Sequence, residues 1–377
     1  MDIIERLIAH PRLALVAGLD AVTPAVHIWD CANGQPRPIG VLGVRSRLSV
    51  AWHPTDAVLA VATEAGVVRW TPDGTTTQPG STHRCIAFSP GGRALWTDAG
   101  RLDLTTGELD AGPEWDTGLV VHPSGLVAAA LRSDQGATLV LFTRYATDQP
   151  ELRFRSRALI ITADGYQAPV FNADGRRFAI RGNNYENSID VYAFPSLEHV
   201  LAVPLGEPAA AWNAPEHDAW YEEYRSWSPH NLAFGTRPAV LYVGTPAGTL
   251  AAIDVERGEL TEHPALDGSR VTALAALATG GLVVAGSRGE LRLLADAACV
   301  TVPDAEGATA LLGGTALMPD DADEPDELTD GVRGWTQDDL DTVTAAEPTD
   351  PPWLRIQAAM NTYRPQAREQ SGADAAD

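Results

Sequence analysis

The segment CIAFSPGGRALWTDAGRLDLTTGEL, from Cys85 to Leu109, contains the pattern that decides the fold of this chain. A short apolar stretch ends in the turn sequence Ser89-Pro90-Gly91-Gly92, and a second one ends at Asp98-Ala99-Gly100. A third stretch ends at Asp103 and is followed by another glycine-containing turn. Short apolar runs between Gly, Pro and Asp residues are typical of antiparallel strands joined by tight turns. The segment therefore predicts a small antiparallel β-sheet.

The same order of strands and turns recurs along the chain, in seven units. The second residue of the first turn in each unit is Pro11, Pro54, Pro90, Pro123, Ala173, Thr236 or Ala278. Most of the intervals lie near the spacing of about 40–45 residues that is typical of four-stranded propeller blades. Weaker fourth strands follow in most units, for example at Arg37–Leu42 and Ala298–Val302. No helical periodicity longer than three turns precedes residue 330, which excludes a doubly wound fold and helical repeats.

Closure of seven such sheets into a ring leaves only short, protected strand edges. We therefore predict an all-β fold, a seven-bladed β-propeller with four-stranded antiparallel blades, over residues 4–312. A sandwich would account for the strands but not for the repeated turns. From about Gly313 the pattern stops, and residues 313–377 are predicted to be an acidic, largely disordered tail that contains the run Asp320–Glu327. Within this tail, residues 335–340 suggest a helical turn, and residues 353–363 suggest a short amphipathic helix with Trp353, Ile356, Met360 and Tyr363 on one face.

Composition and charge exclude several classes of protein. The chain has 377 residues and a formal net charge of −23, and all its 27 basic residues are Arg, so generic binding of nucleic acid is not expected. No apolar stretch reaches the roughly 18 residues of a membrane-spanning helix. The three cysteines, Cys31, Cys85 and Cys299, form no CxxC pair, which favours a reducing, cytoplasmic location without disulfides or a zinc site.

The units resemble WD repeats. The first contains the pair Trp29-Asp30, and the third contains Ser81-Thr82-His83 after Gly80 and then the turn sequences described above. The resemblance covers roughly residues 4 to 302 and implies a rigid platform that binds other proteins. In that family a His, a Ser or Thr, an Asp and the Trp link the strands of a blade through hydrogen bonds. Here His83 and Asp98 are expected to form part of one such set, while apolar packing holds the other blades.

Enzyme motifs are not evident in the sequence. It contains no GxSxG elbow, no HExxH motif, no phosphate-binding glycine loop and no spaced Cys and His ligands, so we predict no catalytic residue, no cofactor and no metal. The alternative is a lactonase-like propeller hydrolase with a metal in the central channel. Asp164, Asn172 and Asn183 are the candidates for that role, although Asn172 also suits a tight turn.

An insertion between units five and six carries the first candidate site. It runs from about Gly206 to Asn231, and Asn213 and Pro215 suggest the start of a helix. Three aromatic residues then follow at helical spacing, with a fourth beside them: Trp220, Tyr224 and Trp227, and Tyr221. One interpretation is a short helix that packs its rings on the propeller. The other is an exposed recognition surface, since Trp and Tyr are enriched in binding hot spots.

A second candidate is the long turn Asn183-Asn184-Tyr185 of unit five. In WD repeats this turn and the connection between blades open onto the same face. We therefore predict a partner-binding face near blades 5 and 6 that includes Asn183, Asn184, Tyr185, Trp220, Tyr221, Tyr224 and Trp227. The predicted function is a non-catalytic scaffold for protein–protein interactions, whose partners and oligomeric state the sequence leaves open.

Two further segments admit two interpretations each. Arg153-Phe154-Arg155-Ser156-Arg157 places three Arg on one face of a strand, which suits the solvated side of an outer strand better than a phosphate or RNA site. The segment around Trp353 either docks on the propeller or binds another protein.

Overall fold

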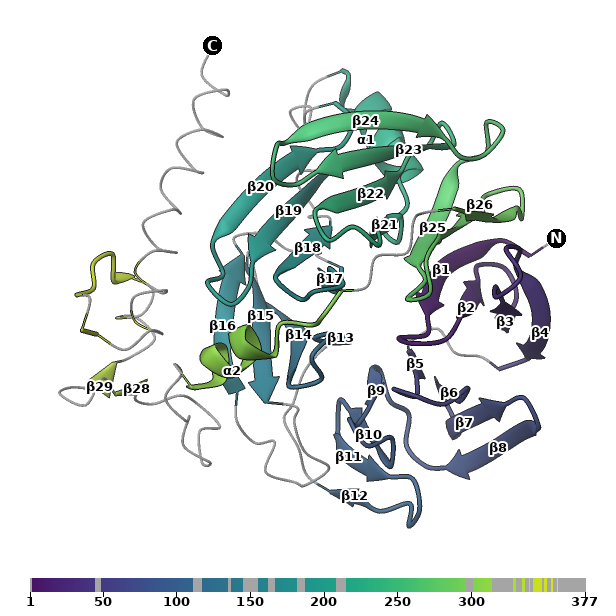
Figure 1. The fold of residues 1–377 in the computed structure, drawn as a ribbon, viewed down its shortest axis with the longest axis horizontal. Helices are drawn as coiled ribbons and strands as arrows, with labels where there is room; N and C mark the ends of the chain where they lie inside the picture. The colour runs from purple at the N-terminus through teal and green to yellow at the C-terminus, as the bar shows by residue number, and fades with distance from the viewer. Residues whose placement is uncertain are drawn as a thin grey trace.

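The chain forms a ring of β-sheets arranged around a common axis (Figure 1). The computed structural model describes residues 2–44, 49–110, 117–134, 137–144, 155–161, 167–181, 187–207, 215–295 and 301–313. Beyond these it describes residues 328–329, 334–335, 339, 342–347, 349–350, 354 and 358. Each sheet is built from strands that are consecutive in the sequence, and neighbouring strands are antiparallel.

The first four blades are four-stranded. Blade 1 contains β1 (Ile4–Ala9), β2 (Leu15–Asp20), β3 (Val26–Asp30) and β4 (Arg37–Leu42). Blade 2 contains β5 (Val50–Trp52), β6 (Leu59–Thr63), β7 (Gly66–Thr71) and β8 (Gly74–Pro79). Blade 3 contains β9 (Ile86–Phe88), β10 (Ala94–Thr97), β11 (Gly100–Asp103) and β12 (Leu109–Asp110). Blade 4 contains β13 (Thr117–Val121), β14 (Val127–Asp134), β15 (Ala137–Arg144) and β16 (Arg155–Ile161).

Blades 5 and 6 are also four-stranded. Blade 5 contains β17 (Val170–Phe171), β18 (Arg177–Arg181), β19 (Ser188–Ala193) and β20 (His199–Pro204). Blade 6 contains β21 (Leu232–Phe234), β22 (Val240–Gly244), β23 (Thr249–Asp254) and β24 (Glu259–Pro264). Blade 7 has three strands among the described residues, β25 (Val271–Ala276), β26 (Leu282–Gly286) and β27 (Leu291–Leu294). Most of the fourth strand predicted at residues 298–302 lies outside the described residues. The prediction of seven antiparallel blades is confirmed.

Apolar clusters fill every junction between neighbouring blades. The described residues contain seven of them, each drawn from two adjacent sheets. The cluster between blades 4 and 5 surrounds Phe142 and Phe178, both fully buried, with ring centroids 5.8 Å apart. Full burial of such a side chain contributes roughly 1.5–3 kcal/mol, so the stacked sheets stabilise one another.

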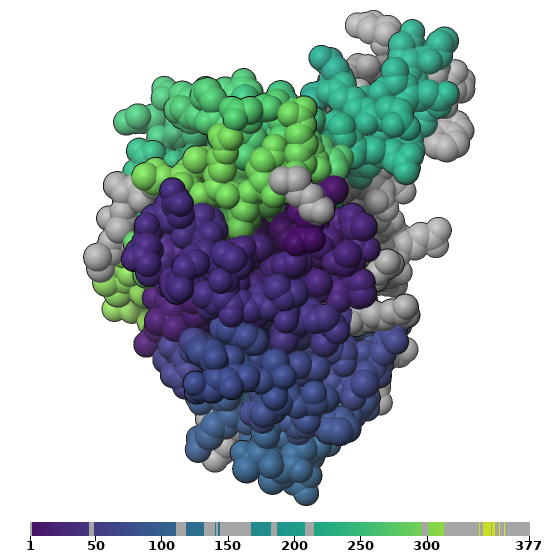
Figure 2. Space-filling model, turned by 90° about the vertical axis from the view of Figure 1, so that its right-hand side faces the viewer, coloured from purple at the N-terminus to yellow at the C-terminus, as the bar shows by residue number. Residues whose placement is uncertain are grey.

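The ring closes by packing between the first and last blades. The innermost strands β1 and β25 lie side by side, and Ile4 and Leu7 pack with Ala273 and Ala275 in one buried cluster. The hydroxyl of Thr272 also donates to the backbone carbonyl of Ile4 at 2.6 Å. In Figure 2 the green residues of the last blades rest directly on the purple residues of blade 1. No described strand is exchanged between the two ends of the chain, and the described contacts across this junction are the apolar packing and the Thr272 hydrogen bond.

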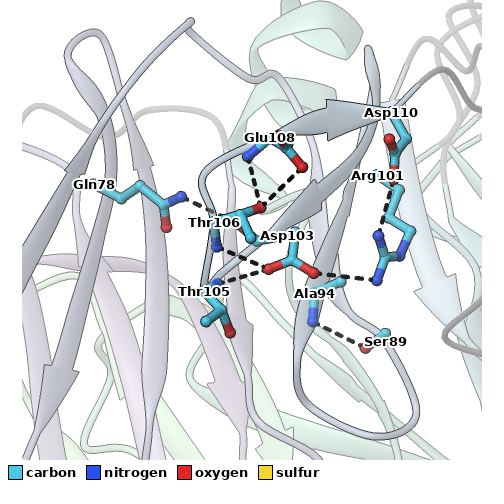
Figure 3. A network of polar contacts seen from close by, with 9 residues as sticks. All are labelled: Gln78, Ser89, Ala94, Arg101, Asp103, Thr105, Thr106, Glu108 and Asp110. Atoms are coloured by element: carbon cyan, nitrogen blue, oxygen red, sulfur yellow. Dashed lines mark hydrogen bonds and ion pairs between the residues drawn. The ribbon is translucent and has the colours of Figure 1, made fainter.

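The turn after the third strand of several blades repeats one arrangement. In blade 3 the carboxylate of Asp103 accepts hydrogen bonds from the backbone N–H groups of Thr105 and Thr106, at 2.8 and 3.0 Å (Figure 3). Both bonds lower the pKa of the Asp103 carboxyl group, and the bond from Thr106 has the larger effect. Gly107, four residues after Asp103, has a φ of 78°, a conformation that glycine adopts without steric cost. The same Asp and Gly spacing recurs at Asp254–Gly258, so the repeated sequence pattern encodes a repeated turn.

The ring has two distinct faces. We call the face that carries the turns between second and third strands and the connections between blades the connection face. The opposite face carries the turns between first and second strands and between third and fourth strands, and we call it the turn face.

Side chains on the turn face join neighbouring blades. His10 donates through Nε2 to the backbone carbonyl of Asp56 at 2.9 Å, and His122 bonds in the same way to the carbonyl of Gly175. Asn172 takes the equivalent position in blade 5 and donates to the carbonyl of Pro238 at 2.9 Å. In each case the residue just before the predicted first-turn position of one blade bonds to the next blade.

A helix that the sequence did not predict lies on the turn face. Helix α2 (Ala305–Gly313) follows Asp304, whose carboxylate pairs with Arg176 of blade 5 at 3.4 Å. Ala308 and Leu311 of α2 are buried against Leu197 in the cluster of blades 4 and 5. Leu197 has a φ of 61°, where other blades have glycine, and its buried side chain supplies this contact with α2.

The tail is only partly described. Leu328–Thr329 and Gly334–Trp335 pair as the short strands β28 and β29, so Trp335 is not in the predicted helical turn. A helical hydrogen bond instead joins the N–H of Val343 to the carbonyl of Asp339. Leu354 and Ala358 lie within the helix predicted at 353–363, and both are helical and buried. Their burial favours the interpretation in which this segment docks on the propeller. The acidic run 320–327 and Trp353, Ile356, Met360 and Tyr363 lie outside the described residues.

Candidate protein-binding surface on the connection face

Helix α1 (His217–Ser226) lies in the connection from blade 5 to blade 6. It follows Pro215, and Glu216 occupies the N-cap position without a side-chain hydrogen bond to the helix. The predicted cap, Asn213, lies outside the described residues, and the prediction that it caps the helix is wrong because the helix begins later. In Figure 2 the teal residues that include α1 project beyond the body formed by the other blades.

Four rings form a continuous patch on α1, which we call the α1 aromatic patch: His217, Trp220, Tyr221 and Tyr224. The centroids of Trp220 and Tyr224 are 5.6 Å apart, and those of Tyr221 and Tyr224 are 6.1 Å apart with nearly parallel planes. His217 stacks on Tyr221 at 6.2 Å. No residue of α1 is buried, and Tyr221 is 44% exposed. The other three rings are half-buried, so the propeller covers the patch only in part.

Trp227 behaves differently from the patch. It ends the helix in an extended conformation, with φ −81° and ψ 130°, so it does not continue the helical face as the spacing predicted. Its half-buried ring packs against the apolar cluster of blades 5 and 6. Trp227 therefore attaches α1 to the propeller, and a hydrogen bond of 3.1 Å from Trp220 Nε1 to the carbonyl of Glu207 fixes the other side.

Acidic side chains surround the patch. Asp218, Glu222 and Glu223 are exposed acidic residues of α1. Arg225 in the last turn is the basic residue of this helix. Arg225 pairs with Glu222 at 3.7 Å and lies 5.4 Å from the centre of the Tyr221 ring. The patch thus already holds one guanidinium over an aromatic face, an arrangement in which cations are attracted to the ring.

The Asn183-Asn184-Tyr185 turn lies outside the described residues. Its flanks are described: Arg181 ends β18, and Arg181 bonds to Asn187 on the other side of the turn. Arg181 also contacts Ser228 and Asn231, which follow α1 in the sequence. The two ends of the turn therefore lie beside the connection that carries α1.

Of the three residues suggested for a channel metal, the described part of the chain contains Asn172. Asp164 and Asn183 lie outside it. Asn172 is fully buried, and both ends of its amide are used, since Oδ1 accepts from the N–H of Arg177 and Nδ2 donates to Pro238. The simpler interpretation of Asn172 as a turn residue is supported.

Asp2, Asp20 and His27 form a different group, with possible ligand atoms within 4.8 Å of one another. The carboxylate of Asp20 already accepts hydrogen bonds from Val22 and Thr23, which hold its pKa low. The hydrogen bonds of the local turn therefore explain the position of the Asp20 carboxylate in this group.

Three other predictions concern the pair His83 and Asp98, the cysteines and the arginine-containing strand of blade 4. His83 Nδ1 lies 3.6 Å from Asp98 Oδ1, so the two residues predicted to pair are neighbours. Cys31 and Cys85 are buried free thiols, and burial raises the pKa of Cys31 to about 11. Cys299 lies outside the described residues.

Arg155–Ile161 is the outer strand of blade 4, as predicted, while Arg153 and Phe154 lie outside the described part. Within that part, no helix is long and apolar enough to cross a membrane.

The contacts of Arg181 beside α1 were not predicted. Its partners Asn187, Ser228 and Asn231 lie in separate segments, and each looks ordinary in its own segment. The sequence signal was Arg181 itself, because it lies at the end of a strand whose other positions are largely apolar.

No family model matches this sequence, and no curated protein matches it. Among solved structures, a chain described as Kuenenia stuttgartiensis hydrazine synthase is similar, with a TM-score of 0.58 and 14% sequence identity. The similarity covers 79% of this chain and 97% of that chain. The likeness is one of fold. At this identity it shows a propeller architecture and carries no statement about activity.

Proposed function

We propose that this protein is a non-catalytic scaffold of WD-repeat type that binds other proteins through the α1 aromatic patch. The observation that carries the proposal is a set of rings on a helix that Trp227 anchors to the ring: Tyr221 is exposed, and Trp220 and Tyr224 beside it are only half-buried. Rigid aromatic side chains lose little conformational entropy on binding and dominate many interfaces. We propose that Asn183, Asn184 and Tyr185, the other residues of the predicted face, also contact the partner.

Charge indicates the kind of partner. Because Asp218, Glu222 and Glu223 border the patch, a partner segment with Arg or Lys side chains would be electrostatically complementary. Its cations would also be attracted to the exposed ring faces. We therefore expect a protein partner with a basic segment, in the cytoplasm.

The test compares wild type with Trp220→Ala/Tyr221→Ala. Truncation of two central aromatic anchors is expected to weaken partner binding by at least about 30-fold, since hot-spot residues each contribute about 2 kcal/mol or more. A partner is first identified by affinity purification from the native host, and its purified basic segment is then titrated by calorimetry. Binding should also weaken as salt is raised, because salt screens exposed charges.

A matched control separates this surface from the rest of the ring. Leu260 is 55% exposed on the outer strand of blade 6, and Leu260→Ala should leave the affinity unchanged. Leu260→Ala should unfold within about 0.5 kcal/mol of wild type, and the double variant within about 1.5 kcal/mol, because it also loses the hydrogen bond from Trp220 to Glu207. Equal affinity of wild type and the double variant would refute the proposal.

The alternative function, that of a propeller hydrolase, stays a prediction, since the propeller fold also occurs in enzymes. Metal analysis of the purified protein decides it: a stoichiometric divalent ion that chelation removes together with activity would favour the enzyme.

A further inference from the structure

Blade 7 differs from the other blades at its outer edge. Its sheet has three strands among the described residues, whereas the other six blades have four. Strand β27 is therefore the last strand of this sheet, and no described strand pairs with its outer edge. It contains no buried residue, whereas the third strands β3, β7, β11, β19 and β23 each contain at least one. Strand β27 is thus less covered than its counterparts in those blades.

The chain that follows β27 continues to another blade. Thr301 and Val302, the described end of the predicted fourth strand, belong to no strand, and Val302 is 83% exposed. Two residues later the N–H of Asp304 donates to the carbonyl of Asp174 in blade 5 at 2.7 Å, and its carboxylate pairs with Arg176. Two residues span at most about 7 Å, so Val302 lies beside blade 5. Figure 1 shows α2, which begins at the next residue after Asp304, across the ring from β25 and β26.

The backbone of β27 offers hydrogen-bonding groups at this edge. The N–H of Gly286 donates to the carbonyl of Glu290 at 2.9 Å, so these two residues form a hydrogen-bonded pair next to β26 and β27. Hydrogen-bonded pairs alternate with non-bonded pairs along an antiparallel ladder. Arg292 therefore bonds to β26, and the N–H and carbonyl groups of Leu291 and Leu293 point away from β26.

The side chains of β27 divide between the two faces of the sheet. Leu291 and Leu293 are half-buried and pack at the border of the cluster between blades 7 and 1, which also includes half-buried Trp29. Arg292 lies on the opposite face, and its side chain is 44% exposed. It pairs with Asp267 at 2.7 Å, but Asp267 is itself 89% exposed. The guanidinium group is therefore accessible to a further carboxylate from outside.

The outer strands of other blades indicate what a fourth strand contributes. In blade 5, Leu201 and Val203 of β20 pack in the cluster shared with blade 6, and in blade 1 Ile39 of β4 packs in the cluster shared with blade 2. A strand beside β27 would place apolar residues at alternate positions in the same way, on the side of Trp29. The residue between them would lie opposite Arg292, where an acidic side chain is complementary in charge.

We propose that the open edge of β27 binds an extended segment of another protein, which adds as the fourth strand of blade 7. Unpaired strand edges are templates for such addition. The segment has the pattern apolar–acidic–apolar. Its two apolar residues exchange backbone hydrogen bonds with Leu291 and Leu293, and its acidic residue pairs with Arg292. This surface is separate from the α1 aromatic patch, since α1 lies between blades 5 and 6.

The experiment titrates a fluorescently labelled peptide, STVEVTS, with full-length protein and follows binding by fluorescence anisotropy. The comparison peptide STPEVTS has proline in place of the first valine, so it lacks one N–H group that would bond to β27. We expect it to bind about tenfold more weakly or worse, because a carbonyl group of β27 then stays unpaired beneath the peptide.

A variant of the protein tests the charge pair. Arg292→Gln should weaken binding of STVEVTS about two- to fivefold, as expected for an exposed ion pair, and should not change binding of the uncharged peptide STVQVTS. Arg257→Gln is the matched control, because it removes an arginine that is 71% exposed in blade 6. Trp220→Ala/Tyr221→Ala should bind STVEVTS as wild type does, so failure here is distinguishable from failure of the protein-binding proposal for α1.

Hydrogen–deuterium exchange locates the bound peptide. The amide hydrogens of Leu291 and Leu293 should exchange quickly in the free protein and slowly with STVEVTS bound, while exchange in the outer strand β24 stays unchanged. Equal binding of STVEVTS and STPEVTS would overturn the proposal. So would slow exchange of both amides in the free monomer, which would mean that the chain covers its own edge. A dimer in sedimentation that the peptide dissociates would also overturn it, because a second copy would then be the occupant.

Discussion

Replacing Gly175 by alanine is expected to lower the free energy of unfolding by about 2–5 kcal/mol, from two separate costs. Gly175 has a φ of 76°, which disfavours any residue with a Cβ atom. A Cβ there would also lie 2.2 Å from Nε2 of His122, which belongs to the neighbouring blade and bonds to the carbonyl of Gly175. The substitution therefore strains the turn and separates blades 4 and 5.

Gly125 is the matched control, at the same turn position in blade 4. It has a φ of 72°, and a Cβ there would meet nothing within 4 Å. The reason is that the preceding blade has the small Ser89 where blades 1, 2 and 4 have histidine. Gly125→Ala should therefore cost only the conformational part, about 1–2 kcal/mol. Urea unfolding of the two variants measures the difference, and equal losses would contradict an energetic contribution from the contact between blades.

Acidification is expected to destabilise the ring as the pH falls below about 6.5, the ordinary pKa of histidine. Burial lowers the pKa of His10, His53 and His122, all at the same turn position. Because the folded state favours the neutral ring, its stabilising effect is complete above pH 6.5 and is lost at lower pH. Protonation would also remove the acceptor role of His122 Nδ1 toward the N–H of Ser124.

Variants at His122 test this mechanism. At pH 7.5, His122→Ala should lose about 2–4 kcal/mol, because it removes a buried ring and leaves the Gly175 carbonyl unpaired. The gap between wild type and His122→Ala should narrow as the pH falls below about 6.5, because the lowered pKa of His122 links protonation of its ring to unfolding. His122→Asn, which copies the Asn172 arrangement of blade 5, should retain part of the stability and show a weaker pH dependence. Parallel pH profiles for wild type and both variants would contradict the proposed role of His122.

The strands were largely predictable because their signals are local. The predicted fourth strand Arg37–Leu42 is β4 with the same bounds, and the predicted turns at Pro11, Pro54 and Pro90 separate first from second strands. Alternation of apolar residues and the turn chemistry of Gly, Pro and Asp act over a few residues, so they can be read from one segment at a time. The order and number of blades follow from this repetition.

The candidate sites were less predictable. The helical spacing of Trp220, Tyr224 and Trp227 predicted a helix with aromatic residues, but the sequence left open whether their rings are hidden. The structure separates Trp227, which packs on blades 5 and 6, from the α1 aromatic patch, in which no ring is buried and Tyr221 is exposed. Helix α2 was missed because its burial depends on Leu197 and the cluster of blades 4 and 5, which lie far from it in the sequence.

The amino-acid sequence by itself determined a seven-fold repetition of short antiparallel strands and the turns between them, since each unit encodes its own hydrogen-bonding pattern. Only the tertiary structure decided which side chains meet across blades: the bonds of His122 and Asn172 to the next blade, and those of Arg181 to Ser228 and Asn231. The physical reason is that these contacts depend on closure of the ring, which brings together residues from distant units that no local pattern relates.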